Sequence, residues 1–236
     1  MFSRRNLLIK SISSLLYLPF SGCAKAVHLS SINHEHRVNK LSDSPNFNKS
    51  TKRFQHPAGD LYDKSFGDLF DFFGEYFGRP DDKWETTGFP VIKSKISELQ
   101  HFNENVVWVG HASIMINHSN LTILTDPHFS DYASPFSFMG PKRITTVPFT
   151  ILDLPPLDVV IISHNHFDHL DEQSIRQIAI HQPQVKFLVP LGLKKLLLEW
   201  GANDVKELDW WQSIQIKSAT FQPTPVQHWS KRSAFD

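Results

Sequence analysis

The chain has little cysteine, no excess charge of either sign and no long apolar run, and each absence excludes a class of protein. Its single cysteine rules out an internal disulfide framework. Lys plus Arg and Asp plus Glu both number 24, so the net charge is zero and we expect no nucleic-acid partner, which would need a basic surface. No run of about 18 apolar residues occurs, which excludes an ordinary transmembrane helix.

What the chain does contain is enough apolar surface for a core and an unusual number of histidines. The hydrophobic fraction is 40%, with 19 Phe and 6 Trp, which excludes wholesale disorder. Thirteen His stand against one Cys. Any metal ion must therefore be bound by imidazole and carboxylate rather than by thiolate.

Residues 1–26 have the basic start, modest apolar stretch and small residues of a secretory signal. Adjacent arginines near the start resemble the twin-arginine export motif of bacteria, and the residues before Cys23 resemble a lipobox. Ala24-Lys25-Ala26 offers a competing cleavage site. We expect residues 1–23 to be a signal peptide and the protein to be exported, either periplasmic or a membrane-anchored lipoprotein with lipid on Cys23. The alternative is a short helix with no targeting role.

Two segments precede the main domain, which we place at residues 105–236. Residues 24–58 are polar and lack helical or strand periodicity, so they predict a linker. The extension at residues 59–104 contains large apolar residues at helical spacing: Phe66, Leu69, Phe70, Phe73 and Phe77. This aromatic helix either packs on the core or meets a lipid bilayer or acyl chains.

Short β-branched runs predict strands at residues 106–109, 113–116, 121–125 and 157–163. The last of these leads directly into the sequence His164-Asn165-His166-Phe167-Asp168-His169. Residues two apart in an extended turn point the same way, so His164 and His166 can bind one metal ion. Asp168 and His169 then fall near a second position.

Imidazole and carboxylate ligands suit Zn²⁺, Mn²⁺ or Fe²⁺, and neutral histidine favours zinc. Two ions about 3.5–4 Å apart can share a hydroxide and stabilise the charge that develops in hydrolysis. The alternative is a polar loop at a strand end that binds no metal.

Helices at residues 171–181 and 192–200 alternate with strands at 185–190 and 205–208. This order predicts a parallel-type sheet with helices on its outer face, and ligands collect beyond the carboxyl ends of such strands. A further run at residues 219–225 leads in the same way to His228, our candidate for a third imidazole on the first ion. Otherwise His228 is an ordinary loop residue.

The H-x-H-x-D-H turn after an apolar strand resembles the signature of the metallo-β-lactamase superfamily. Further blocks are similar to the N-acyl phosphatidylethanolamine-hydrolysing phospholipase D group, and they occur in the same order between about residues 105 and 232. They are residues 108–112, 125–127, 138–143, 189–192, 207–211 and 227–232, together with the turn itself.

The resemblance implies an α/β fold of the αβ/βα sandwich type, two zinc ions and a possible homodimer. It implies that a metal-bound hydroxide attacks the phosphorus of an N-acylated phospholipid and releases an N-acylethanolamine and phosphatidic acid. Carried over by position, one zinc is held by His164, His166 and His228, and the other by Asp168 and His169. Asp168 would also be catalytic, because it would hold or deprotonate the attacking water. His111, Asp126 and Asn165 would orient the ligands by hydrogen bonds to them without binding the metal. The alternative is that they are ordinary turn or strand-end residues.

The chain departs from the family after His228. The family needs a bridging carboxylate after a Gly-Asp-Thr-like strand end and a final histidine, and only residues 229–236 follow His228. We therefore expect the sequence to contain the first lobe of the sandwich and only part of the second, as a fragment or a truncated product. We also expect the 236-residue chain by itself to be inactive. The alternatives are a lactonase or another phosphodiesterase on the same site, or an inert lipoprotein that binds zinc or lipid.

Overall fold

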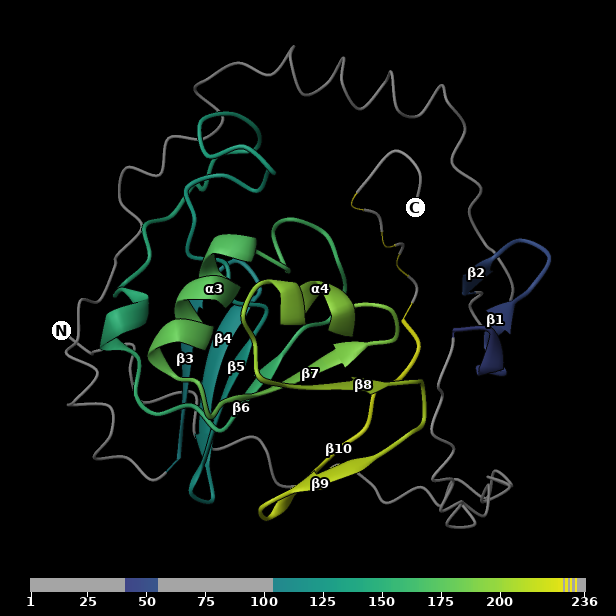
Figure 1. The fold of residues 1–236 in the computed structure, drawn as a ribbon. Coiled ribbons are helices and arrows are strands. Elements are labelled where there is room, and N and C mark those ends of the chain that lie inside the picture. The colour runs from purple at the N-terminus through teal and green to yellow at the C-terminus, as the bar shows by residue number, and fades with distance from the viewer. Residues whose placement is uncertain (1–40, 55–103, 227, 229, 231, 233–236) are drawn as a thin grey trace, which may run out of the picture. The chain divides into compact units, whose positions relative to one another are not determined.

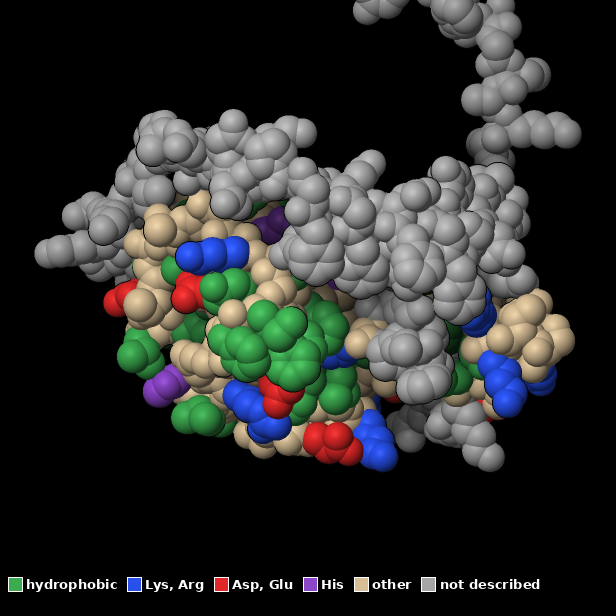
Figure 2. Space-filling view, turned by 90° about the horizontal axis from the view of Figure 1, so that it is seen from above, with side chains coloured by type: hydrophobic (Ala, Val, Ile, Leu, Met, Phe, Trp, Pro, Cys, Tyr) green, Lys and Arg blue, Asp and Glu red, His purple; other side chains and the backbone are tan. Residues whose placement is uncertain are grey.

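The computed structural model describes residues 41–54, 104–226, 228, 230 and 232 (Figure 1). The predictions of a signal peptide with Cys23 and of an aromatic helix over residues 66–77 lie outside these ranges. Within them, no helix combines the length and the hydropathy needed to cross a bilayer. On the face drawn in Figure 2, Lys and Arg side chains are interspersed with Asp and Glu, as the zero net charge suggests.

A six-stranded sheet forms the centre of the fold. Its strands follow the chain in order: β3 (Asn105–Gly110), β4 (Ser113–His118), β5 (Leu121–Thr125), β6 (Val159–Ile161), β7 (Lys186–Pro190) and β8 (Asp204–Leu208). The first three strands pair antiparallel, and β5 to β8 pair parallel. The predicted strands are confirmed, and the sheet is mixed rather than wholly parallel.

One face of the sheet is covered by α3 (Glu172–His181), α4 (Lys194–Glu199) and the short 3₁₀ helix η3 (Ile151–Asp153). Figure 1 shows α3 and α4 together on the same side of the strands. Leu124, Val160 and Phe187 point to this side and are fully buried against the helices, where Ile178 and Leu197 are also fully buried. Alternate residues of a strand face opposite sides, so their neighbours must be buried by a different layer.

That second layer is a hairpin of β9 (Ile214–Ile216) and β10 (Ala219–Phe221). Its apolar side chains pack on Ile123, Val159 and Leu188, the residues that alternate with the first set. The sheet therefore lies between helices and strands, which confirms an α/β sandwich.

The strand before His228 differs from the prediction, because β10 does not extend the central sheet. Lys217, with a φ of 50°, reverses the chain after β9, so β10 pairs with β9 instead. The apolar side chains of this hairpin therefore pack on the face of the central sheet, and the hairpin does not add a strand to its edge.

Residues 41–54, part of the segment predicted to be a linker, have secondary structure that the sequence did not predict. This segment forms the 3₁₀ helix η1 (Leu41–Asp43) and a small hairpin of β1 (Phe47–Asn48) and β2 (Arg53–Phe54). The buried carboxylate of Asp209 accepts hydrogen bonds from the Ser44 hydroxyl at 2.5 Å and the Asn46 amide at 3.0 Å. Local periodicity could not reveal this structure, because the polar side chains pair with a residue far along the chain.

Candidate metal centre

The strand directions bring three separate strand ends to one edge of the sheet. β4 runs antiparallel to both β3 and β5, so β3, β5 and β6 all point the same way. His111 follows β3, Asp126 follows β5, and the turn that begins at Ser163 follows β6. The candidate residues therefore meet beyond the carboxyl ends of these strands, as ligands do in α/β sheets.

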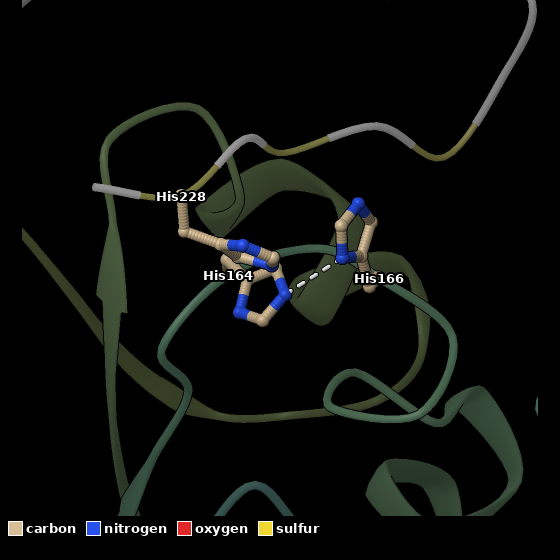
Figure 3. A group of neighbouring side chains, drawn as sticks. All are labelled: His164, His166 and His228. Atoms are coloured by element: carbon tan, nitrogen blue, oxygen red, sulfur yellow. Dashed lines mark hydrogen bonds between the residues drawn. The ribbon is translucent and has the colours of Figure 1, made fainter. Parts of the chain in front are cut away.

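The first group of donors is His164, His166 and His228, the set predicted for the first metal ion (Figure 3). Each residue offers one ring nitrogen, and these atoms lie within 4.8 Å of one another. Nε2 of His164 lies 2.8 Å from Nδ1 of His166. Figure 3 shows the His228 ring reaching these two from a different part of the chain.

The segment that carries His228 is fastened to the turn by its neighbours. The Ser230 hydroxyl donates to Oδ1 of Asn165 at 2.6 Å, and Arg232 donates to the Asn165 carbonyl at 3.1 Å. The Arg232 guanidinium also lies over the Phe167 ring, 4.1 Å from its centroid. Asn165 therefore positions His228 by binding its segment, whereas we predicted that it would orient a ligand directly.

The second group consists of His111, Asp168 and His169, whose donor atoms also lie within 4.8 Å of one another. Nε2 of His111 is 2.8 Å from Oδ2 of Asp168, and Nε2 of His169 is 3.6 Å from the same oxygen. We predicted Asp168 and His169 as the only ligands here, with His111 behind them. The structure instead places His111 beside both as a third donor.

A local distortion turns His111 toward the site. The pairing of β3 and β4 shifts between Trp108 and Gly110, and Gly110 and His111 have φ values of 142° and 51°. The Trp108 indole N–H donates to the His111 carbonyl at 2.8 Å and holds this turn. The Gly-His pair at the end of a predicted strand was the available signal, but only the strand pairing shows where the imidazole points.

Asp126 is buried behind His169. Its Oδ2 is 2.8 Å from Nδ1 of His169 and 2.7 Å from the Ser163 hydroxyl, while its Oδ1 accepts the Ser163 backbone N–H at 2.7 Å. This contact leaves Nε2 of His169 facing Asp168. The geometry matches the orienting role predicted for Asp126, because a carboxylate on one ring nitrogen fixes the tautomer and the direction of the other.

The protonation states of His164 and Asp168 suit metal binding. Burial, together with the neighbouring His169, His166 and His228, lowers the pKa of His164 to about 4, so this imidazole is neutral near pH 7. Burial acts to raise the pKa of Asp168, but the hydrogen bond from His111 and the charge of His169 hold it well below its usual range. Burial acts to lower the pKa of His169. The hydrogen bond with Asp126 and the charges of Asp126 and Asp168 have the larger effect, so the net shift of this pKa is upward.

Metal ligands must be deprotonated, and neutral imidazole and ionised carboxylate meet that requirement. Each group offers three donors, which leaves coordination positions open for water or substrate, as in catalytic zinc sites. The two groups are joined by the turn at residues 164–169. The residues present therefore fit a pair of adjacent divalent metal ions.

Residues 122–236 match the family model described as a beta-lactamase superfamily domain. Over 138 residues the chain is 39% identical to N-acyl-phosphatidylethanolamine-hydrolyzing phospholipase D 1 of Caenorhabditis elegans, covering 55% of this chain and 39% of that protein. Over 133 residues it is 38% identical to the mitochondrial N-acyl-phosphatidylethanolamine-hydrolyzing phospholipase D of Saccharomyces cerevisiae, covering 55% and 28%. The chain thus matches less than half the length of these curated relatives.

Among solved structures, the diiron β-hydroxylase CmlA of Streptomyces venezuelae is 25% identical, with a TM-score of 0.41 over 67% of this chain and 30% of its own. A metallo hydrolase of Ignicoccus hospitalis is 18% identical, with a TM-score of 0.40 over 53% and 49%. The family match and the sequence identities, rather than these structures, carry the similarity. Residues 122–236 are thus similar to domains of the metallo-β-lactamase superfamily, and the chain is similar in sequence to N-acyl-phosphatidylethanolamine-hydrolysing phospholipases D.

Proposed function

We propose that this chain provides the metal-binding site of a hydrolase that cleaves the phosphodiester of N-acyl phosphatidylethanolamine into N-acylethanolamine and phosphatidic acid. The observation that carries the proposal is the pair of three-donor groups, which are formed by residues that follow β3 and β6 together with His228. The two relatives named for this activity are 39% and 38% identical to the chain over 138 and 133 aligned residues, 55% of the chain in each case.

In this proposal His164, His166 and His228 hold one divalent ion, and His111, Asp168 and His169 hold the other, with zinc as the expected metal. When bound, such a pair lowers the pKa of a water molecule and stabilises negative charge on phosphoryl oxygens. The remaining contributions come from the chain itself. Asp126 keeps Nε2 of His169 directed into the site, and the Ser163 hydroxyl keeps Asp126 in place.

Asp168 is the residue proposed to act on the nucleophile. Its carboxylate is ionised and about one-third exposed, and His111 holds one of its oxygens at 2.8 Å. A carboxylate in this state can accept a proton from water or orient it by a hydrogen bond. His111 restricts the direction in which that oxygen is offered.

The test is an assay of N-acyl phosphatidylethanolamine beside a panel of lactones, with Asp168→Asn as the variant and His118→Asn as the control. His118 lies at the far end of β4, exposed and beside Glu104. In a protein that carries this chain together with the rest of the family's domain, we expect phosphodiester turnover that falls at least about 100-fold in Asp168→Asn and is unchanged in the control. Turnover of lactones without phospholipid cleavage would replace the proposed reaction with that of a lactonase.

A further inference from the structure

A loop beside the second donor group has a well-defined base. Residues 131–143 leave and rejoin the body through an antiparallel bridge between Tyr132 and Lys142. The Arg143 N–H donates to the Asp131 carbonyl at 2.7 Å, and the Ala133 N–H donates to the Pro141 carbonyl at 2.9 Å. The two sides of the loop are therefore held together like the strands of a hairpin.

The tip of this loop exposes three large apolar side chains, Phe136, Phe138 and Met139, which we call the aromatic tip. Their exposed fractions are 51%, 73% and 52%, and the two phenyl rings lie 5.9 Å apart. Single exposed apolar residues are ordinary, but a cluster of them marks a surface that meets another apolar phase.

The backbone of the loop directs the aromatic tip outward. The Phe136 N–H donates to the Ser134 hydroxyl at 3.1 Å, which forms a tight turn. Gly140 has a φ of 121°, and a Cβ there would lie 2.5 Å from the Ser134 Cβ. The two arms are thus packed too closely for Phe136 and Phe138 to fold back between them.

Arg143 ties the base of the loop to the metal site. Its guanidinium donates to the carbonyls of Ser130 and His128 and lies 2.9 Å from Nδ1 of His128. Its Nη1 would be only 3.1 Å from a Cβ on Gly110, the residue before His111. The base of the loop therefore lies beside the residue that precedes His111.

We propose that the aromatic tip inserts into the interfacial layer of a phospholipid bilayer and thereby places the second donor group next to lipid headgroups. This inference rests on the proposed function, whose substrate is a membrane phospholipid, and adds the surface that would reach it. Aromatic side chains favour the membrane interface, and the exposed Lys142 at the base of the loop can meet anionic headgroups.

A lipid surface suits the aromatic tip better than a protein partner does. A stable protein interface buries about 800 Å² on each side, and three side chains on one projecting turn provide far less. Shallow insertion into a bilayer needs only the side chains themselves. We therefore expect the aromatic tip to bind a bilayer and not a second copy of this chain.

The experiment is co-sedimentation with phosphatidylcholine vesicles, with and without phosphatidylglycerol. Every variant carries Cys23→Ser, so that a lipid on this thiol cannot contribute. The tip variant is Phe136→Ser/Phe138→Ser, and the matched control is Leu152→Ser/Ile180→Ser, whose side chains are 68% and 72% exposed on η3 and α3. We expect vesicle binding to weaken at least about tenfold in the tip variant and to stay unchanged in the control.

The bound metal content separates this inference from the proposed function, because it is measured without any need for turnover. It should be the same in the tip variant as in the parent chain if the metal site is intact. Absence of bound metal from the parent chain and from every variant, with vesicle binding retained by the parent chain, would count against the proposed function alone. Equal vesicle binding by the parent chain and the tip variant, or none by either, overturns the lipid inference. A change of oligomeric state without vesicle binding overturns it in favour of a second copy.

Discussion

His111 and Asp126 adopt backbone conformations that few side chains tolerate, with φ values of 51° and 38°. Such conformations cost free energy and persist where the surroundings hold them. Here Trp108 holds the His111 carbonyl, and Asp126 accepts two hydrogen bonds from Ser163. Both residues stand at strand ends, where the distorted backbone turns their side chains toward the metal turn.

Replacing His228 with alanine should weaken the first metal position while leaving the second in place. The loss should be about 100-fold or more, because even residues that only orient a ligand contribute about 10- to 100-fold. Cobalt titration followed by visible absorption would measure both positions, with His118→Ala as the control. An equal loss at both positions would mean that the two groups do not bind separate ions.

Replacing Asp126 with asparagine should act mainly on the second position, through His169. Asp126 raises the pKa of His169, so the substitution should lower that pKa in the metal-free protein. Metal affinity at the second position should fall about 10- to 100-fold. Histidine titration by NMR and metal competition would measure the two effects, with exposed Asp153→Asn as the control. An unchanged pKa of His169 would show that the contact with Asp126 is not its cause.

The elements that formed as predicted are those whose signal is local. The apolar residues of α3 recur at helical spacing, with Ile175 and Ile178 fully buried, and β3 to β5 alternate or run apolar over their whole length. β9 escaped prediction because only Ile214 and Ile216 mark it, and its partner surface lies on strands far earlier in the chain. The 41–54 segment escaped for the same reason, because its anchor is Asp209.

At the edge of the sheet, Asp204 of β8 forms ion pairs with two lysines. Burial acts to raise the pKa of Asp204, but hydrogen bonds from Lys186 of β7 and Lys206 of β8 lower it. A carboxylate with a lowered pKa stabilises the fold above its unfolded pKa, and this stabilisation disappears as the pH falls through the folded value. Asp204→Asn should therefore cost about 0.5–1 kcal/mol near pH 7 and progressively less in acid.

Urea unfolding of Asp204→Asn and of the parent chain over a range of pH would measure this difference. Glu199→Gln, on α4 beside Lys195 at 3.8 Å, is the control for an exposed ion pair. A cost that did not shrink in acid would assign the effect to the packing of Asp204 rather than to its charge.

At the scale of the whole molecule, the sheet packs between two different layers, and the two donor groups lie beyond the carboxyl ends of its strands. Five imidazoles and a carboxylate gather there from strand ends and a distant segment. In the metal-free protein, burial and then the neighbouring imidazoles lower the pKa of His164, so this ring is neutral and able to bind a metal ion. Metal ions should therefore stabilise the folded chain directly.

Adding zinc at 100 times its dissociation constant should raise the free energy of unfolding by about 2.7 kcal/mol for each site. Thermal or urea unfolding with and without zinc would measure this, beside the variant His111→Ala/His166→Ala, which lacks one donor in each group. An equal gain in the variant would mean that zinc acts elsewhere on the molecule.

The sequence by itself determined the order of strands and helices and the histidine turn at residues 164–169. Both depend on neighbours in the chain, through side-chain alternation and the extended turn after β6. Only the tertiary structure decided that His111 joins Asp168 and His169, that Asp126 holds His169, and that β9 and β10 cover the second face of the sheet. Those contacts require knowing which strands lie side by side and in which direction each runs, and the antiparallel pairing of β3, β4 and β5 alone turns the ends of β3 and β5 to the same edge.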